Sequence, residues 1–188
     1  MRGLIAALIL GGVAVAAPAR SEVEQATPVM FDIEQSLTID APVQQVWDTL
    51  RSPQKWWSHD HTYTDNSANL YLDSQATGCF CEKIPGKGSV EHGRIVFIQA
   101  PRALRLSAAL GPLQAEAVTG TLTIVLAPEG DKATKVSLAY IVSGYAKGGL
   151  DAIAPKVDDV LAVQMKGLKT AAEAPPAPAP ADEGEAKK

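Results

Sequence analysis

Apolar and polar residues alternate along residues 31–40. Because neighbouring side chains of a strand point to opposite faces, this period of two predicts a β-strand with one wet face. Residues 43–50 change to spacings of three and four, which place one apolar stripe on a helix that ends at Pro53. The stripe consists of Val43, Val46, Trp47 and Leu50. Residues 54–58 then predict a short second helix that carries two tryptophans.

A polar segment over residues 59–69 predicts a long loop, and a run of strand and turn patterns follows it. The predicted strands are residues 70–73, 79–84, 89–99, 103–110, 118–127 and 134–145. Their short connections favour antiparallel pairing. Helical spacing returns from about Asp151 to Thr170, with Pro155 in the first turn. One amphipathic helix is therefore available to cover the apolar face of one sheet.

The two ends of the chain differ in composition from this middle region. A short basic start, an apolar run and a small-residue site at residues 17–19 predict a secretory signal peptide over residues 1–19. An uncleaved membrane anchor is the alternative, but the run of about 14 apolar residues is shorter than the roughly 20 that cross a bilayer. Residues 172–188 are rich in Pro, Ala and Glu, which predicts a disordered tail. Residues 20–30 are then a linker to one domain over residues 31–171.

Export and charge limit the partners that we expect. The signal peptide predicts a periplasmic or secreted protein with no membrane span after cleavage, and we expect a monomer or weak dimer. The net charge is −4, and the sequence lacks a stripe of Lys and Arg with interleaved aromatic residues, so nucleic acid is not expected as a partner. Hydrolase, phosphate-loop and dinucleotide motifs are missing from the sequence, and no cofactor is predicted.

Three short stretches resemble a known superfamily. Residues 39–42 read Ile-Asp-Ala-Pro, residues 46–50 read Val-Trp-Asp-Thr-Leu, and residues 53–57 read Pro-Gln-Lys-Trp-Trp. Together with the element order over residues 31–170, they resemble the START/Bet v-like (SRPBCC) superfamily, and within it the branch of heat-shock ATPase activators and polyketide cyclase-like proteins. The resemblance implies an α+β helix-grip fold, in which a curved antiparallel sheet of about six to seven strands wraps around a long C-terminal helix and encloses a cavity.

This superfold hosts lipid carriers, cyclases, hydroxylase domains and co-chaperones, so the resemblance does not select one function. Activation of the heat-shock ATPase needs a cytosolic, ATP-dependent partner, which an exported chain does not meet. The leading hypothesis is an exported protein that holds a small apolar or aromatic ligand, lipid or polyketide-like, between sheet and helix. A cyclase or dehydratase-type enzyme in the same cavity and a chaperone-like interaction protein are the alternatives.

Two histidines and two cysteines have spacings that metal sites use: His59 and His61, and Cys79 and Cys81. Both patterns are short and common, and a polar loop beside small buried thiols explains them as well, so no metal is predicted. In an extended strand, the Cα atoms of residues i and i+2 lie about 6.5 to 7 Å apart, at or beyond the usual limit for a disulfide. We therefore expect Cys79 and Cys81 to be reduced thiols.

Strand alternation leaves two orientations open for residues 79–84. One face carries Cys79, Cys81 and Lys83, and the other carries Phe80, Glu82 and Ile84. If Glu82 faces inward, desolvation should raise its pKa and make it a candidate general acid or base; otherwise it is solvated or paired with an Arg or Lys. His92 is expected to meet this strand across a turn, where it is either a hydrogen-bonded structural residue or a partner in proton transfer on a ketone or enol.

Aromatic residues near the predicted loop are candidates for the cavity mouth, because flat rings with a polar group suit an apolar ligand. Plain packing of the short helices is the alternative role for the two tryptophans. The candidate ligand-binding residues are Trp56, Trp57, His61, Tyr63, Cys81, Glu82, His92 and Tyr140. The candidate catalytic residues are Glu82 and His92.

Overall fold

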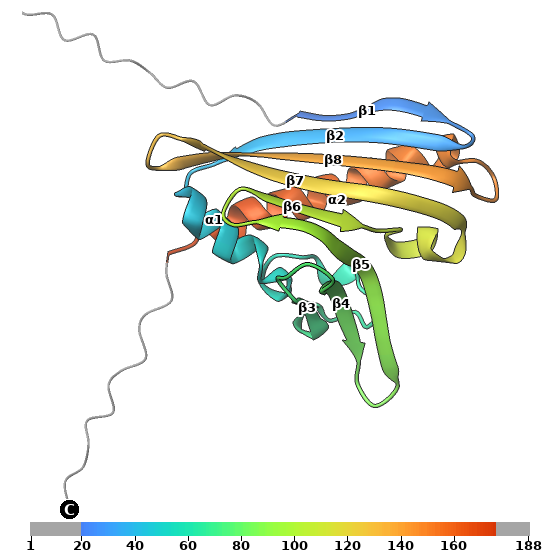
Figure 1. The fold of residues 1–188 in the computed structure, drawn as a ribbon, viewed down its shortest axis with the longest axis horizontal. Helices are drawn as coiled ribbons and strands as arrows, with labels where there is room; N and C mark the ends of the chain where they lie inside the picture. The colour runs from blue at the N-terminus through green and yellow to red at the C-terminus, as the bar shows by residue number, and fades with distance from the viewer. Residues whose placement is uncertain (1–19, 176–188) are drawn as a thin grey trace, which may run out of the picture.

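A computed structural model describes residues 20–175 of the chain (Figure 1). In this part of the chain, one antiparallel sheet has the strand order β1-β2-β8-β7-β6-β5-β4-β3. The strands are β1 (Arg20–Thr27), β2 (Met30–Ile39), β3 (Leu70–Leu72), β4 (Cys79–Ile84), β5 (Gly88–Gln99), β6 (Ala103–Ser107), β7 (Ala117–Glu129) and β8 (Ala133–Tyr145). The helices are α1 (Val43–Leu50) and α2 (Leu150–Glu173), with short 3-10 turns η1 (Pro53–Lys55), η2 (His59–His61), η3 (Ser67–Asn69) and η4 (Gly111–Ala115). This is the expected α+β helix-grip fold.

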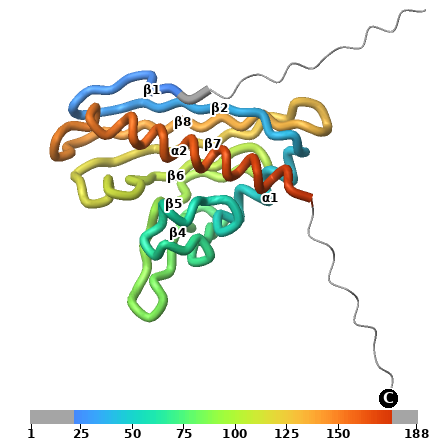
Figure 2. Tube along the Cα trace, turned by 180° about the vertical axis from the view of Figure 1, so that it is seen from behind, coloured from blue at the N-terminus to red at the C-terminus, as the bar shows by residue number. Residues whose placement is uncertain are grey.

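The period-two pattern of the long strands decides which face of the sheet packs against α2. In β8, every second residue from Thr134 to Val142 is buried, while Lys135 and Ile141 between them are exposed. Figure 2 shows α2 lying across one face of the sheet. Burial of apolar side chains from both sides stabilises this contact by roughly 25 cal/mol per Å².

Residues 20–27 form an edge strand, and the expectation of a linker over residues 20–30 was wrong for this part. β1 pairs with β2 from Arg20 opposite Ser36 to Thr27 opposite Met30, with a bulge after Val23. Among the β1 residues whose side chains the structure describes, Val23 packs against the core. An edge strand of this kind is held mainly by main-chain hydrogen bonds to its neighbour, which leave no apolar period in the sequence.

The C-terminal helix also continues past its expected end at Thr170. Ala172 is only 1 % exposed, and the carboxylate of Glu173 accepts a hydrogen bond from the Asp40 amide at 2.8 Å. Residues 172 and 173 therefore belong to the domain and not to the tail. Pro155 lies inside the helix, beyond its first turn. The predicted signal peptide and the rest of the predicted tail lie outside the described residues.

The sheet changes direction along β5, and this bend shapes the candidate site. The first half of β5 pairs with β4 and the second half with β6, and the register shifts once in each pairing. Figure 1 shows β4 and the first half of β5 extending away from the long strands. Bulges bend a strand and increase its twist, so these shifts account for the bend. Across residues 20–175, none of the helices combines the length and apolarity that a membrane crossing needs.

Candidate functional site

A cavity of about 500 Å³ lies between α2, residues 57–63 and residues 110–112. Its apolar wall comprises Trp57, Leu110, Pro112, Ile153, Val157, Val160 and Leu161. Its polar groups belong to Asp60, His61, Thr62, Tyr63, His92 and Lys156. A space of this size, mostly apolar and with a few polar groups, has the usual properties of a small-molecule site, for which volumes run from roughly 300 to 1,000 Å³.

A β-bulge directs His92 into this cavity. Phe80 pairs with Gly93 and Cys81 pairs with Glu91, so His92 is the extra residue of β5 between the two pairs. His92 and Gly93 are consequently both buried, which regular alternation does not allow. A Cβ atom on Gly93 would lie 2.8 Å from the Ala108 Cβ, so the backbone approaches β6 closely beside the bulge.

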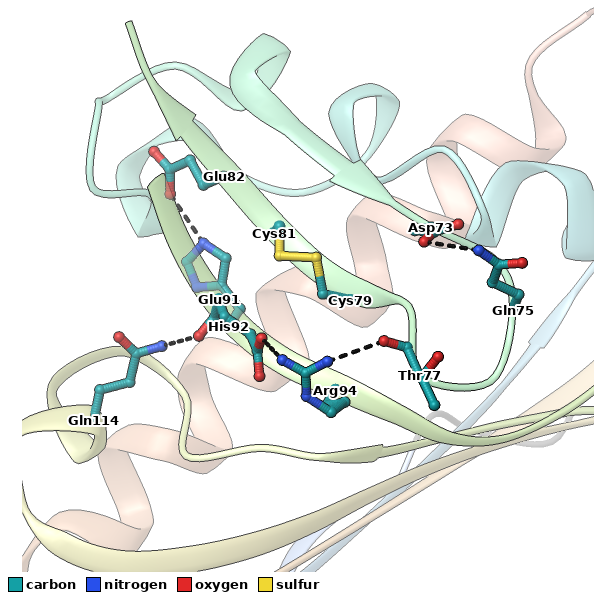
Figure 3. Close-up of a disulfide and its surroundings, with 10 residues drawn as sticks. All are labelled: Asp73, Gln75, Thr77, Cys79, Cys81, Glu82, Glu91, His92, Arg94 and Gln114. Atoms are coloured by element: carbon teal, nitrogen blue, oxygen red, sulfur yellow. Dashed lines mark hydrogen bonds and ion pairs between the residues drawn. A yellow bond between two sulfur atoms is a disulfide. The ribbon is translucent and has the colours of Figure 1, made fainter. Parts of the chain in front are cut away.

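His92 is paired with a fully buried carboxylate. Its Nε2 lies 3.0 Å from Glu82 Oε2, and the two residues are 5 % and 0 % exposed (Figure 3). The carboxylate accepts three further hydrogen bonds: from the Tyr63 amide at 3.0 Å, the Thr64 amide at 2.8 Å and the Thr64 hydroxyl at 2.7 Å. Each carboxylate oxygen thus has two donors or ring nitrogens within reach, which compensates for the loss of water.

The pKa of Glu82 is lowered, whereas the sequence analysis expected an inward-facing Glu82 to have a raised pKa. Burial raises the pKa, but the hydrogen bonds from Thr64, Tyr63 and His92 together lower it by more, so it lies below the ordinary value of 4.5. The donors come from a loop about 20 residues earlier in the chain, and strand alternation carries no information about them. Glu82 is ionised at neutral pH.

His92 is neutral at neutral pH, with its proton on Nε2. Burial lowers its pKa below the ordinary value of 6.5, although the hydrogen bond and the negative charge of Glu82 raise it in part. Because an ionised carboxylate only accepts hydrogen bonds, Nε2 must donate to Glu82. Nδ1 then carries a lone pair, and among the described residues no group donates to it. The Phe80 and Tyr63 rings flank the imidazole, with centroids 4.9 and 5.8 Å away.

The second imidazole of the cavity belongs to His61, and it differs from His92 in which ring nitrogen carries the proton. The Gln164 side chain of α2 is 2 % exposed, and its Oε1 accepts a hydrogen bond from the Ser58 amide at 2.8 Å. This orients the amide nitrogen toward His61, whose Nδ1 lies 2.7 Å away. Nδ1 is therefore the acceptor, and neutral His61 carries its proton on Nε2. The cavity wall thus contains an imidazole acceptor at His92 and an imidazole donor at His61.

The structure brings Trp57, His61, Tyr63 and His92 together on the cavity wall. These residues come from different segments of the chain. The prediction for the cavity mouth named Trp56, Trp57, His61 and Tyr63, and Trp56 is not part of this wall. Trp57 also has a structural contact, because its Nε1 donates to the His61 carbonyl at 3.0 Å and its ring packs against Phe80. Pocket lining and packing, which the sequence analysis treated as alternatives, are therefore combined in Trp57.

The other candidate residues do not line this cavity. Trp56 packs against the core and its Nε1 donates to the Leu50 carbonyl at 3.3 Å. Glu82 lies behind the wall, where it is hydrogen-bonded to His92 and to the Tyr63 amide. Tyr140 is 0 % exposed: its hydroxyl donates to the Ala108 carbonyl and accepts from the Leu110 amide, and burial raises its pKa to about 12. Tyr140 therefore supports the segment that supplies Leu110 to the cavity.

Sequence analysis missed Lys156 and the segment over residues 110–112. Lys156 lies three residues after Ile153 and four before Val160, which is the spacing of one helix face, so the signal was present in the sequence. Leu110 was expected to end the strand over residues 103–110, with a turn at Gly111 and Pro112, and nothing local shows that η4 folds back over the cavity. Hydrogen bonds to residues distant in the sequence fix this position: the Leu110 amide donates to the Tyr140 hydroxyl, and the Tyr63 hydroxyl donates to the Gly111 carbonyl.

Cys79 and Cys81 form a disulfide, so the prediction of reduced thiols was wrong (Figure 3). Their Cα atoms lie 5.4 Å apart, which is well within the range for disulfides and shorter than the spacing in a regular extended strand. The register of β4 shifts between Phe80 and Cys81, at the bulge that also carries His92. The expectation assumed a regular pleat, and the bulge removes that regularity. Cys81 is therefore part of a covalent link beside the cavity and not of its lining.

Within residues 20–175, no three side chains of His, Cys, Asp or Glu gather as a metal ion requires. His59 Nδ1 lies 3.2 Å from the exposed Asp60 carboxylate, whereas His61 is turned toward Gln164. The two histidines of the His-Asp-His motif thus have different partners.

Comparison with known proteins identifies the fold. No protein-family model matches the sequence, and no curated protein matches it either. A conserved protein of unknown function from Enterococcus faecalis superposes with a TM-score of 0.57 at 12% identity, over 85% of this chain and 79% of that one. An uncharacterized protein from Rhizobium leguminosarum gives 0.52 at 14% identity, over 84% and 99%. A protein from Chromobacterium violaceum gives 0.51 at 18% identity, over 77% and 98%.

The chain has the helix-grip fold. At such identities the likeness to these structures concerns the fold alone. Because one fold hosts many functions, the function has to be argued from the cavity and its residues.

Proposed function

We propose that this protein is an exported binding protein that holds a small apolar or aromatic molecule in the cavity between α2 and residues 57–63. The observation that carries the proposal is the cavity itself, which has a volume of about 500 Å³ and an apolar wall. The resemblance of residues 53–57 to the polyketide cyclase-like branch supports a ring-containing or lipid-like ligand. The predicted signal peptide supports binding outside the cytoplasm.

The inner face of α2 supports an apolar ligand. Ile153, Val157 and Val160 lie on the cavity side of the helix but are only half-buried, unlike Leu161 and Leu168 further along it. A ligand that covers these side chains removes apolar surface from water, and each Å² contributes roughly 25 cal/mol. The wall therefore provides affinity without a specific polar contact.

The polar groups of the cavity define how such a ligand is oriented. His92 offers an acceptor at Nδ1 and His61 offers a donor at Nε2, and both imidazoles are held by buried partners. A ligand with one hydroxyl and one carbonyl group satisfies both. Lys156 and Asp60 have exposed side chains at the rim, where opposite charges keep the entrance close to neutral.

A pair of matched helix variants tests where the ligand binds. Val157→Trp places an indole inside the cavity, so we expect it to weaken the binding of 1-naphthol at least about tenfold, the scale of a lost buried contact. Val163→Trp makes the same change on the same helix at an exposed position outside the cavity, and its affinity should equal that of the wild type. Isothermal titration calorimetry measures both.

Equal affinity in the two variants would contradict binding in this cavity. Native mass spectrometry of protein purified from its own compartment would then identify what is carried. If the wild type binds no apolar probe and carries nothing, the interaction-protein alternative is favoured.

A further inference from the structure

We propose that the cavity is also a proton-transfer site, in which Nδ1 of His92 removes a proton from a carbon atom of a bound aromatic ligand. The ligand class is a carbon acid whose C–H lies next to a carbonyl or C=N group. The inference rests on the proposed function, because it needs an aromatic ligand in the cavity. His92 is the catalytic residue, and Glu82 is a positioning residue that acts through it.

The hydrogen bonds around Glu82 prepare His92 for this step. The Tyr63 amide and the Thr64 amide and hydroxyl hold the carboxylate, and the carboxylate holds Nε2–H of His92 at 3.0 Å. This arrangement selects the tautomer in which Nδ1 is the base and stabilises the imidazolium that forms when Nδ1 takes a proton. Apolar binding alone requires neither a buried carboxylate nor a bulge that turns His92 inward.

The surroundings of His92 favour its basic form at neutral pH. Burial lowers the pKa of His92, so Nδ1 is unprotonated and ready to accept a proton. The titratable groups that face it are Glu82 from β4, Tyr63, His61 and Asp60 from the segment before β3, and Lys156 from α2. Only Glu82 is hydrogen-bonded to it. The pH at which activity is half-maximal should therefore lie below 6.5 and respond to Glu82.

His61 gives the reaction a second polar group. Its Nε2–H is the donor that a developing negative charge on oxygen needs, since Gln164 occupies Nδ1. With a ketone, the C–H electron pair forms the C=C bond of an enolate, the carbonyl π pair moves to oxygen, and the proton goes to His92. The proton then returns to the enolate oxygen through water, so the net reaction is a keto–enol tautomerisation without oxidant or cofactor.

A synthetic carbon acid tests the base without knowledge of the natural ligand. In 5-nitrobenzisoxazole, removal of the ring C–H proton converts C=N to C≡N as the N–O bond breaks, and the released nitrophenolate is followed by its absorbance. We expect saturable turnover above the buffer rate. His92→Gln should lower this rate about 100-fold, the lower range for a positioned general base. His59→Gln is the matched control, because His59 is exposed and lies outside the cavity, and its rate should equal that of the wild type.

The pH profile separates positioning from folding. In Glu82→Gln the negative charge that raises the pKa of His92 is gone, so the midpoint of the rate profile should shift to lower pH. A variant that merely loosens the fold lowers the rate without moving the midpoint, and that result overturns the role of Glu82. Circular dichroism verifies the fold of each variant. If His92→Gln does not fold, Val157→Trp decides, because it blocks the cavity and should abolish turnover.

Two outcomes distinguish this inference from the proposed function. Quenching of tryptophan emission by the nitro group reports binding of the probe independently of turnover. If the wild type binds the probe but turns it over no faster than His92→Gln does, the proton-transfer inference is overturned and the binding proposal stays intact. Turnover that persists in Val157→Trp has the same meaning. Absence of binding up to the solubility limit of the probe overturns both for aromatic ligands.

Discussion

At the scale of single residues, burial and hydrogen bonds together determine the protonation states of Glu82 and His92. Glu82 and His92 are both inaccessible to water, and for both groups burial disfavours the charged form. Glu82 nevertheless keeps its charge because four hydrogen-bonding groups meet its two oxygens. His92 has only one such partner and is neutral. The hydrogen bonds thus keep the buried Glu82 ionised, and burial favours the neutral form of His92 beside it.

The lowered pKa of His92 makes stability depend on pH. The unfolded imidazole, with its ordinary pKa of 6.5, binds protons at a higher pH than the folded one. The contribution of His92 to the free energy of unfolding should therefore be complete above about pH 6.5. It should decrease as the pH falls toward the pKa of His92 in the folded protein. Urea unfolding of the wild type at several pH values from about 7 to about 5 should show this slope.

His92→Gln should reduce the slope, since glutamine does not titrate. His59→Gln is again the matched control and should retain the slope of the wild type, because His59 is solvent-exposed. Identical slopes in the two variants would assign the pH dependence to other groups.

At the scale of elements, one bulge between β4 and β5 has several consequences. It turns His92 inward, buries Gly93 against β6, and lies at the point in β4 where the Cα atoms of the two cysteines approach. A regular pairing would place either His92 or Gly93 on the outer face. The site therefore depends on a local irregularity in two otherwise ordinary strands.

Gly93→Ala tests this dependence. The added Cβ would meet the Ala108 Cβ at 2.8 Å and the Ser107 carbonyl oxygen at 3.3 Å, so the strands must separate. We expect a loss of about 1 to 3 kcal/mol in the free energy of unfolding, the usual cost of overpacking. The double variant Gly93→Ala with Ala108→Gly removes the closest contact and should recover part of the loss. Chemical denaturation of the two single variants and the double variant measures this coupling; strictly additive effects would mean that the clash is not with Ala108.

At the scale of the whole molecule, both ends of the described chain complete the helix grip. β1 extends the sheet beside β2, and the last turn of α2 contacts the start of α1 through Gln45, which donates to the Ala172 carbonyl at 2.7 Å. Glu173 accepts a hydrogen bond from the Asp40 amide near the end of β2. The C-terminal end of α2 is therefore anchored to Asp40 and Gln45.

Two truncations test this anchor. A chain that ends at Glu173 should keep the melting temperature of the longer chain, because the composition of the residues after it predicts a tail without packed contacts. A chain that ends at Thr170 loses Ala172 and both contacts described above, and its melting temperature should fall by at least about 4 °C if roughly 2 kcal/mol is lost. Differential scanning calorimetry compares the two. A large fall in the longer chain would show that the tail docks on the domain.

Hydrophobic periodicity in the sequence predicts the helix-grip order and the bounds of most strands, because these properties follow from local spacing. β1 was not predicted because its pairing with β2 uses main-chain hydrogen bonds, which leave no pattern in the sequence. The inward orientation of Glu82, the low pKa of its carboxyl group and the disulfide were decided only by the tertiary structure. Each of these depends on atoms distant in the sequence: the Tyr63 and Thr64 donors for Glu82, and the pairing of β4 with β5 for the bulge. Local spacing determines which side chains share a face, whereas contacts between distant segments determine what those side chains can do.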